Sequence, residues 1–316
     1  MRTIDAGELS SVFSFPDLIE ALRQAFAGNF VTPVRHHHTI RRPAEADATL
    51  LLMPAWTDPA TTPAASSFVG VKIVAVQPGN ATRGLPSVNG CYVLMSGETG
   101  QALAAMDGSV LTNWRTAAAS GLAASFLARE DARRLLIIGA GALAPYLIEA
   151  HASVRPISDV LVWNRNRERA EHLAGSLPGR RFSVGVAEDL QQAVGWADVV
   201  SCATLSTEPI VRGAWLTPGA HVDLVGAFTP AMRETDDEAM RRASVYVDTR
   251  AGAFTEAGDI IQAGISESAI AGDLRQLCRR EVSGRRSADE ITLFKSVGTA
   301  LEDLAAAVLA YSRIVG

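Results

Sequence analysis

The spacing of apolar residues changes near residue 116. Before that point, residues 14–27 place Leu18, Ile19, Leu22 and Phe26 on one helix face, after a Ser-Phe-Pro-Asp start typical of a helix N-terminus. Short apolar runs then predict strands at 49–54, 68–76, 87–96 and 101–106, with "SGETG" as a hairpin connection between the last two. We therefore expect an α+β arrangement in the N-terminal part.

After residue 116 the pattern predicts strands that alternate with helices. The helix "TAAASGLAASFLA" comes first, and six apolar segments follow: "RRLLIIGAG", "DVLVWNR", "RFSVGVA", "ADVVSCAT", "HVDLVGA" and "SVYVDT". This alternation is typical of an α/β fold with a Rossmann-type, doubly wound parallel sheet. A last helix, "SVGTALEDLAAAVLAYSRIV", carries Val297, Leu301, Leu304 and Val308 on one stripe, which predicts core or dimer packing.

The composition is that of an ordinary globular chain and argues against several partners. The chain has 316 residues, 48% of them apolar, which is enough for about two domains. A net charge of -5, with scattered lysine and arginine, argues against a nucleic-acid or anionic-membrane surface. Cys91, Cys202 and Cys278 are too few and too isolated for a disulfide framework. Because "MRTIDAGELS" holds no apolar signal segment, and serine and glycine interrupt the apolar stretch near 117–128, we expect a cytoplasmic protein with no membrane partner.

The segment "LLIIGAGALA" has the spacing of a dinucleotide-binding turn. Gly139, Gly141 and Ala144 form G-x-G-x-x-A directly after an apolar strand and at the start of a helix. The first glycine permits the sharp turn, the second lets the backbone approach a pyrophosphate, and the alanine allows close helix packing. The helix N-terminus also offers unpaired amides to the anion. The alternative is a tight strand-helix turn that binds no ligand.

The end of the next strand bears on the choice between NAD(H) and NADP(H). An NAD site usually has Asp or Glu there, which hydrogen-bonds the adenosine ribose. This chain has "VWNRNRERA", in which Asn164, Arg165, Asn166 and Arg167 offer donors and positive charge to a phosphate. NADP(H) is therefore the preferred cofactor, with NAD(H) as the alternative. The arginines could instead solvate the start of the following helix.

One lysine stands inside an apolar strand. In "VGVKIVAVQPGN", Lys72 lies between Val71 and Ile73, and an ammonium group in apolar surroundings is costly unless a partner compensates its charge. Since strand side chains alternate, Lys72 could simply point to water. The other interpretation is that it faces a cleft and meets a negatively charged substrate.

Two further conspicuous features are the histidines at 36–38 and Asp223. Of His36, His37 and His38, at most His36 and His38 share one face of a strand, and no acidic or cysteine partner follows at ligand spacing, so we expect no metal site. Asp223 could serve as an acid, but we expect it to orient backbone groups or Lys72 from the end of its strand.

Several segments together resemble the ornithine cyclodeaminase and mu-crystallin family, and the resemblance covers nearly the whole chain. The most specific feature is R-T-A-A ahead of the Rossmann glycines. The matching segments are "PVR" at 33–35, "LLMPAW" at 51–56, "VGVKIV" at 69–74, "DGSVLTNWRTAAAS" at 107–120, "IIGAGALA" at 137–144, "VWNR" at 162–165, "PGAHVDLVGA" at 218–227 and "TLFKSVG" at 292–298.

The resemblance implies two domains and a homodimer. Residues 1–115 with 299–316 would form a substrate-binding and dimerisation domain, and residues 116–298 an NADP-binding Rossmann domain. For the cofactor we expect contacts from the glycine turn, the strand ends and the segment before the last helix. The residues are Thr116, Gly139, Gly141, Ala142, Leu143, Asn164, Arg165, Asn166, Thr204, Val225, Ser296 and Gly298.

For the substrate, the resemblance assigns carboxylate contacts to Arg35, Lys72 and Arg115, and a catalytic role to Lys72. An α-carboxylate would neutralise such a cationic pocket, so that the substrate becomes the partner of Lys72. Arg41 or Arg42 could take the part of Arg35. Arg115 could instead be a surface cap before the next helix.

The segment "DLVGAFTPAMRE" bears on the reaction. Ornithine cyclodeaminases resemble it but carry an aspartate where this chain has Phe228, and a phenyl ring cannot accept a proton. The resemblance therefore favours the branch that reduces small cyclic imino acids: Δ1-pyrroline-2-carboxylate to L-proline and Δ1-piperideine-2-carboxylate to L-pipecolate, with a part in proline metabolism. The alternatives are an ornithine or lysine cyclodeaminase that uses another base, an amino-acid dehydrogenase, or an NADPH-bound protein that binds small carboxylates without turnover.

Overall fold

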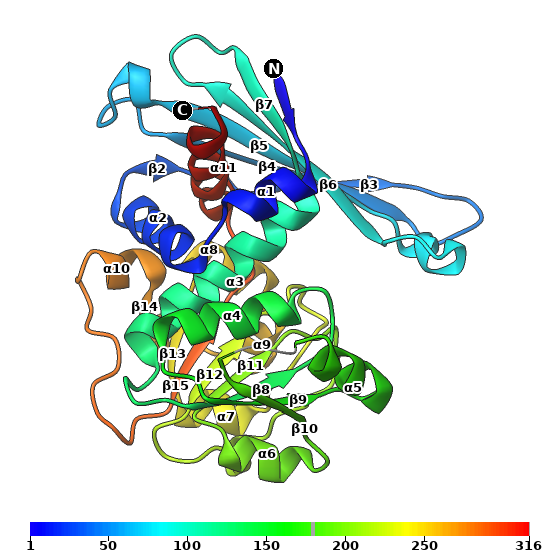
Figure 1. Cartoon of the computed structure of the whole chain (residues 1–316), viewed down its shortest axis with the longest axis vertical. Helices are drawn as coiled ribbons and strands as arrows, with labels where there is room; N and C mark the ends of the chain where they lie inside the picture. The colour runs from blue at the N-terminus through cyan, green and yellow to red at the C-terminus, as the bar shows by residue number, and fades with distance from the viewer. Residues whose placement is uncertain (178–180, 316) are drawn as a thin grey trace. The chain divides into compact units, whose positions relative to one another are not determined.

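The computed structural model describes residues 1–177 and 181–315, and these divide into two units (Figure 1). The first unit combines Met1–Arg115 with the chain from Thr299 on, and the second runs from Thr116 to Gly298. The chain thus leaves the first unit once and returns to it with its last helix.

A seven-stranded sheet forms the centre of the first unit, in the order β1-β7-β6-β5-β4-β2, with β3 also paired to β4. Its central strands are antiparallel, and Gly100, with a left-handed φ of 72°, lies in the turn between β6 and β7. The four predicted strands correspond to β4–β7 and are confirmed. The bounds are β1 (Arg2–Ile4), β2 (Phe30–Val31), β3 (His36–Ile40), β4 (Ala48–Thr57), β5 (Phe68–Val76), β6 (Val88–Ser96) and β7 (Ala102–Asp107).

Helices α1 (Ala6–Val12), α2 (Phe15–Ala27) and α11 (Ala300–Val315) belong to the first unit, with the short 3-10 helices η1 (Ala64–Ser66) and η2 (Pro78–Arg83). The predicted helix at 14–27 is α2, and Ser14 caps it by accepting from the backbone of Asp17. Helix α11 packs on α2 and on strands β4–β6. It begins later than predicted, because Gly298 takes a left-handed φ of 81° before it.

Helix α3 (Gly108–Leu127) also begins at a different place from the predicted helix. Asp107 accepts a hydrogen bond from Val110 N at 2.8 Å, so the helix begins eight residues before Thr116. Arg115 is consequently an internal residue of α3, and it is buried. The interpretation of Arg115 as a surface cap before this helix is therefore wrong.

The second unit contains an eight-stranded sheet in the order β10-β9-β8-β11-β12-β15-β13-β14, in which all the strand pairs are parallel. The six predicted strands are β8–β13. Two strands were not predicted, β14 and β15, and β15 separates β12 from β13. The bounds are β8 (Arg134–Ile138), β9 (Asp159–Trp163), β10 (Ser183–Val186), β11 (Val199–Cys202), β12 (His221–Leu224), β13 (Ser244–Val247), β14 (Gly272–Asp273) and β15 (Thr292–Lys295).

Helices cover both faces of this sheet, with α4 on one face and α6 and α7 on the other (Figure 1). Because both faces are covered, Leu135–Ile138 of β8 are fully buried, as the continuous apolar run predicts. The strand order reverses between β8 and β11, which confirms the doubly wound arrangement. The bounds are α4 (Ala144–Val154), α5 (Arg167–Gly175), α6 (Leu190–Trp196), α7 (Asp237–Arg242), α8 (Arg250–Glu256), α9 (Gly258–Gln262), α10 (Leu274–Cys278), η3 (Gly213–Trp215) and η4 (Glu267–Ala269).

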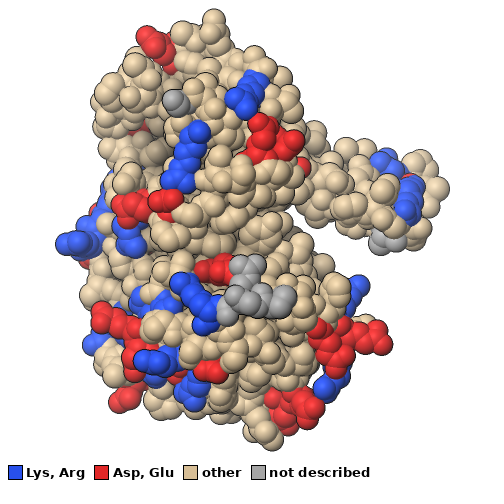
Figure 2. All heavy atoms as spheres, in the orientation of Figure 1, with Lys and Arg blue, Asp and Glu red and all other residues tan. Residues whose placement is uncertain are grey.

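Charged side chains on the surface and the polarity of the helices bear on possible partners. On the face drawn in Figure 2, lysine and arginine side chains lie among aspartate and glutamate side chains, so basic and acidic groups are mixed there. Within residues 1–177 and 181–315, every helix is too short or too polar to cross a lipid bilayer.

Candidate functional site

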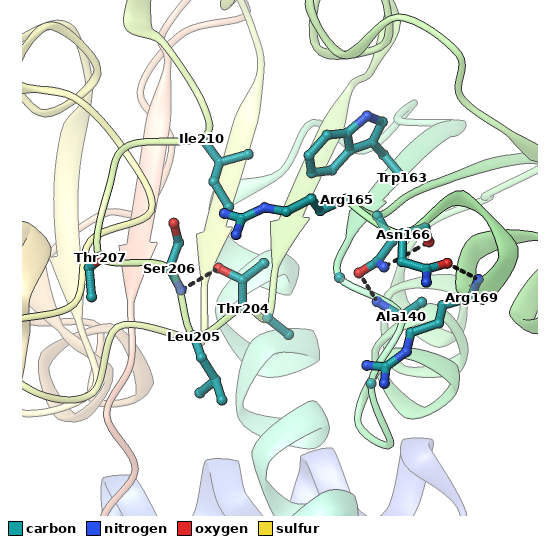
Figure 3. Close-up of a pocket in the computed structure, with 14 residues that line it drawn as sticks. Ala140, Trp163, Arg165, Asn166, Arg169, Thr204, Leu205, Ser206, Thr207 and Ile210 are labelled. Atoms are coloured by element: carbon teal, nitrogen blue, oxygen red, sulfur yellow. Dashed lines mark hydrogen bonds between the residues drawn. The ribbon is translucent and has the colours of Figure 1, made fainter.

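A cavity of about 700 Å³ opens at the carboxyl ends of β8, β9 and β11 in the second unit (Figure 3). We call it the switch-point cavity, because the strand order reverses between β8 and β11, where ligands of doubly wound folds bind. Six of the predicted cofactor contacts line it: Gly139, Gly141, Asn164, Arg165, Asn166 and Thr204. The other lining residues are Ala140, Trp163, Arg169, Ala203, Leu205, Ser206, Thr207 and Ile210.

The two glycines of the turn stand at their positions for different physical reasons. Gly139 has a φ of 107°, and a Cβ there would lie 2.6 Å from the carbonyl oxygen of Ala203, so the fold itself requires glycine. A Cβ on Gly141 would meet nothing within 4 Å, so the space beside its backbone is open to a ligand. The turn therefore fits a pyrophosphate that approaches the backbone closely.

The polar residues after β9 fix the opposite wall of the cavity. Asn164 Oδ1 accepts from the backbone N of Ala140 at 3.3 Å, and Asn166 Oδ1 caps α5 by accepting from Arg169 N at 3.2 Å. Arg165 extends toward Ile210 and Thr204 across the cavity (Figure 3).

The arginines of this segment divide into two kinds. Arg167 lies 2.8 Å from Glu171 and 3.3 Å from Glu188, so it solvates the start of α5 as the alternative interpretation proposed. Arg165 and Arg169 line the cavity. Sequence reasoning missed Arg169, although it stands in the same basic segment, "NRNRER", as Arg165.

Six predicted cofactor contacts are not among the residues that line the cavity. Thr116 lies in α3, Ala142 and Leu143 lie in the turn before α4, and Val225 N donates to Cys202 O at 2.8 Å. Ser296 N donates to Leu224 O at 3.0 Å, and Gly298 N donates to Asp248 Oδ2 at 2.7 Å. Their contact with a cofactor stays a prediction.

The first unit buries a group of alternating charges, which we call the Lys72 cluster: Lys72, Arg115, Glu302 and Asp303. Lys72 Nζ lies 2.8 Å from Asp303 Oδ1, and Arg115 Nε lies 2.9 Å from the same oxygen. Arg115 Nη1 lies 2.6 Å from Glu302 Oε2. Lys72 is 2% exposed, so the interpretation that it points to water is wrong.

Burial and a neighbouring charge lower the pKa of Lys72 toward neutral pH. Burial, together with the charge of Arg115, lowers the pKa of Lys72 to about 8, although Asp303 opposes the change. Burial alone would raise the pKa of Asp303, but Arg115 and Lys72 lower it below its ordinary value. Asp303 therefore stays ionised, while Lys72 gains and loses a proton within reach of physiological pH.

The structure also brings Arg35 near this cluster. The charge of Arg35 contributes to lowering the pKa values of both Lys72 and Asp303. Arg42, considered as a substitute, lies 3.2 Å from Glu45 instead. The three predicted substrate contacts thus belong to one region of the first unit.

Sequence reasoning missed the two carboxylates of α11. Glu302 and Asp303 are fully buried in a helix that is otherwise mostly apolar. The signal was present, because adjacent acidic residues in "ALEDLAAAVL" need cationic partners when they are buried.

A comparison with models of protein families shows to which family this chain belongs. The model of the ornithine cyclodeaminase/mu-crystallin family matches residues 5–316. The chain belongs to this family.

Relatives within the ornithine cyclodeaminase/mu-crystallin family cover almost the whole chain. The Delta(1)-pyrroline-2-carboxylate reductase of Paracoccus denitrificans is 38% identical over 303 residues, 94% of this chain and 92% of that protein. The ketimine reductase mu-crystallin of Rattus norvegicus is 38% identical over 286 residues, 90% and 85% of the two chains. The structure of Thermococcus litoralis Delta(1)-pyrroline-2-carboxylate reductase in complex with NADH and L-proline matches with a TM-score of 0.91 and 33% identity, and the match covers 100% of this chain and 98% of that chain.

Phe228, which the family resemblance singled out, and Asp223, the carboxylate at the end of a predicted strand, both lie in the second unit. Phe228 is 43% exposed and follows Ala227, a non-glycine residue with a φ of 52°. Asp223 is buried within the unit, where it accepts hydrogen bonds from Ser120 and Ser201 and lies 3.1 Å from His151 Nε2. These partners correct the expectation that Asp223 orients backbone groups or Lys72.

The histidines of β3 lie on an exposed strand. The rings of His36 and His38 meet edge to face with centroids 6.3 Å apart, so these two share a face. Across residues 1–177 and 181–315, no three His, Cys, Asp or Glu side chains converge in a metal-binding arrangement.

Proposed function

We propose that this chain is a nicotinamide-dinucleotide-dependent reductase of small cyclic ketimines. Its substrates would be Δ1-pyrroline-2-carboxylate, reduced to L-proline, and Δ1-piperideine-2-carboxylate, reduced to L-pipecolate. The observation that carries the proposal is the buried Lys72 cluster, which joins a titratable ammonium group to a guanidinium group. The names of the relatives and the L-proline bound to the Thermococcus litoralis enzyme support the same reaction.

Reduction of a C=N bond needs a hydride at carbon and a proton on nitrogen. A bound reduced nicotinamide supplies the hydride. Lys72, whose pKa burial lowers to about 8, is still mostly protonated at neutral pH and can hold or deliver the proton at the ring nitrogen. Arg115 and Arg35 bind the substrate carboxylate, because a guanidinium group pairs well with a carboxylate.

For the cofactor, we infer binding in the switch-point cavity, with NADP(H) preferred and NAD(H) as the alternative. The open space beside Gly141 suits a pyrophosphate. Among the lining residues that the structure describes none is Asp or Glu, whereas Arg165 and Arg169 both line the cavity. A carboxylate there would repel a ribose phosphate, and arginine attracts it.

The proposal also assigns a role to each unit and a dimer to the chain. The first unit binds the substrate and the second binds the dinucleotide, and two copies associate through the first unit. Ile40, Leu85 and Val88 support self-association, because these apolar side chains are 42%, 55% and 53% exposed. The molar mass from light scattering tests it: twice the 33.4 kDa chain is expected, and a monomer would contradict it.

The deciding experiment follows the oxidation of NADPH and of NADH with five- and six-membered cyclic ketimines and identifies the product by chromatography. We expect oxidation of the cofactor together with formation of L-proline or L-pipecolate. Release of ammonia from ornithine or lysine would favour a cyclodeaminase. Turnover of an open-chain keto acid with ammonia would favour an amino-acid dehydrogenase. Tight NADPH binding with no oxidation by any imino or keto acid would favour a binding protein.

A further inference from the structure

A buried carboxylate supports the rim of the switch-point cavity. Glu234 is fully buried, and its Oε1 accepts hydrogen bonds from the backbone N and from the Oγ1 of Thr204, each at 2.8 Å. Thr204 lines the cavity, and its Oγ1 accepts from Ser206 N at 3.4 Å (Figure 3). One carboxylate oxygen therefore anchors the rim segment, Thr204–Thr207, all of whose residues line the cavity.

The backbone around Glu234 holds the same stretch of chain at further points. Arg233 N donates to Ser206 O at 2.7 Å, and Ile210 N donates to Glu234 O at 2.8 Å. Ile210 also lines the cavity. The position of the rim segment thus depends on contacts with Glu234 and its neighbour.

Glu234 belongs to a second buried group of charges, which we call the Lys295 cluster: Glu234, Asp259 and Lys295. Asp259 Oδ1 accepts from Glu234 N at 2.9 Å, and Asp259 Oδ2 lies 3.6 Å from Lys295 Nζ. All three side chains are fully buried. Asp259 therefore contacts both the backbone of Glu234 and the ammonium group of Lys295, whose charge also acts on Glu234.

This arrangement makes the charge of Glu234 sensitive to pH. Burial raises the pKa of Glu234 to about 7, with Lys295 opposing the change and Asp259 adding to it. The neighbouring thiol of Cys202 stays neutral, because burial raises its pKa well above the ordinary value. Asp223 stays ionised, because hydrogen bonds from His151 and Ser201 lower its pKa in spite of burial.

We propose that Glu234 is a positioning residue for the dinucleotide: its ionised carboxylate holds Thr204 and the rim segment in place, and loss of that charge weakens cofactor binding. This inference rests on the proposed function, in which the switch-point cavity binds the dinucleotide. The physical reason is that hydrogen bonds to an ionised acceptor are about twice as strong as neutral ones. Affinity for the cofactor should therefore rise as the pH rises through neutrality.

The test measures NADH binding by fluorescence titration at several pH values between 6 and 8. NADH is the suitable probe, because it lacks the 2′-phosphate that titrates in this range. In the wild type we expect the dissociation constant to fall several-fold as the pH rises. In Glu234→Gln, which keeps a carbonyl oxygen but loses the charge, we expect about ten-fold weaker binding at the upper end and no pH dependence.

A matched control and a second variant complete the design. Glu208→Gln changes an exposed carboxylate that follows the rim segment, and it should bind NADH as the wild type does. Thr204→Val removes one of the two hydrogen bonds to Glu234, and it should weaken binding even if Glu234→Gln fails to fold. Wild-type affinity and pH dependence in Glu234→Gln, or unchanged affinity in Thr204→Val, would overturn the inference alone. Absence of any dinucleotide binding by the wild type would instead overturn the proposed function beneath it.

Discussion

Lys72 and Lys295 are the two lysines among the 29 lysine and arginine residues of this chain, and each unit buries one of them. In the Lys72 cluster the cations and carboxylates alternate at 2.6–2.9 Å. In the Lys295 cluster the lysine donates to the backbone carbonyls of Leu224 and Gly226, and the carboxylate of Asp259 lies 3.6 Å away.

The difference decides which group titrates near neutral pH. Burial disfavours the charged form of every group, so the group whose pKa moves toward neutral pH is the one that also lies near a like charge. Beside Arg115 that group is an ammonium, and the pKa of Lys72 falls to about 8. Beside Asp259 it is a carboxylate, and the pKa of Glu234 rises to about 7. We infer that the first cluster handles the proton of the reaction and that the second senses pH behind the switch-point cavity.

The largest expected effect is on turnover after a change in the Lys72 cluster. Lys72→Met should lower kcat/KM on the best ketimine by about 100- to 10,000-fold, the range of general acid catalysis. Binding of NADPH, measured by fluorescence, should stay at the wild-type level. Lys72→Arg is the matched control: it keeps the charge for the carboxylate but cannot release a proton, so kcat should fall more than KM rises. Near-wild-type kcat/KM in Lys72→Met would refute the catalytic role.

The corresponding change in the other cluster should act on stability. Lys295→Met leaves the buried carboxylate of Asp259 without its ammonium partner and removes the positive charge near Glu234, and breaking such a buried pair costs about 3–5 kcal/mol. Urea denaturation should therefore give a free energy of unfolding lower by that amount. A variant as stable as the wild type would mean that the ammonium group of Lys295 does not stabilise the fold, through the carboxylates or through the carbonyls of Leu224 and Gly226.

The third change is in the wall of the switch-point cavity, apart from both clusters. Arg165→Ala should raise the KM for NADPH by about 10- to 150-fold, because a charge-assisted phosphate contact contributes about 1.5–3 kcal/mol. The KM for NADH should change little. Arg167→Ala is the matched control, since Arg167 pairs with Glu171 and Glu188 outside the cavity lining. Equal effects of Arg165→Ala on both cofactors would refute the NADP(H) preference.

The smallest effect is a shift along the pH axis. Asp303→Asn removes an anion beside Lys72, which disfavours the ammonium form and should lower the pKa of Lys72 below about 8. Activity that needs protonated Lys72 falls as the pH rises through its pKa, so the fall should begin at a lower pH in the variant. With 13C-labelled lysine, NMR should show two side-chain signals, and the signal that disappears in Lys72→Met reports Lys72 directly. An unchanged titration would mean that Asp303 does not control the proton on Lys72.

Much of the fold could be predicted from local pattern. The continuous apolar runs predicted β8–β13, and the helical stripe from Leu18 to Phe26 predicted α2. The short strand β15 was missed, because four residues carry little periodicity and its partners β12 and β13 come from elsewhere in the chain. The start of α3 was missed, because Asp107 was not recognised as its cap.

The sequence by itself determined the glycine turn after β8, the class of fold and the need of Lys72 for a partner, because glycine spacing, apolar period and the cost of burying a charge are local properties. Only the tertiary structure decided which residue is the partner of Lys72. Asp303 is 231 residues away from Lys72, and only the packing of α11 on β5 brings the two together. The same holds for Glu234 and Thr204, 30 residues apart, because a buried polar group takes whichever partner the strand order places beside it.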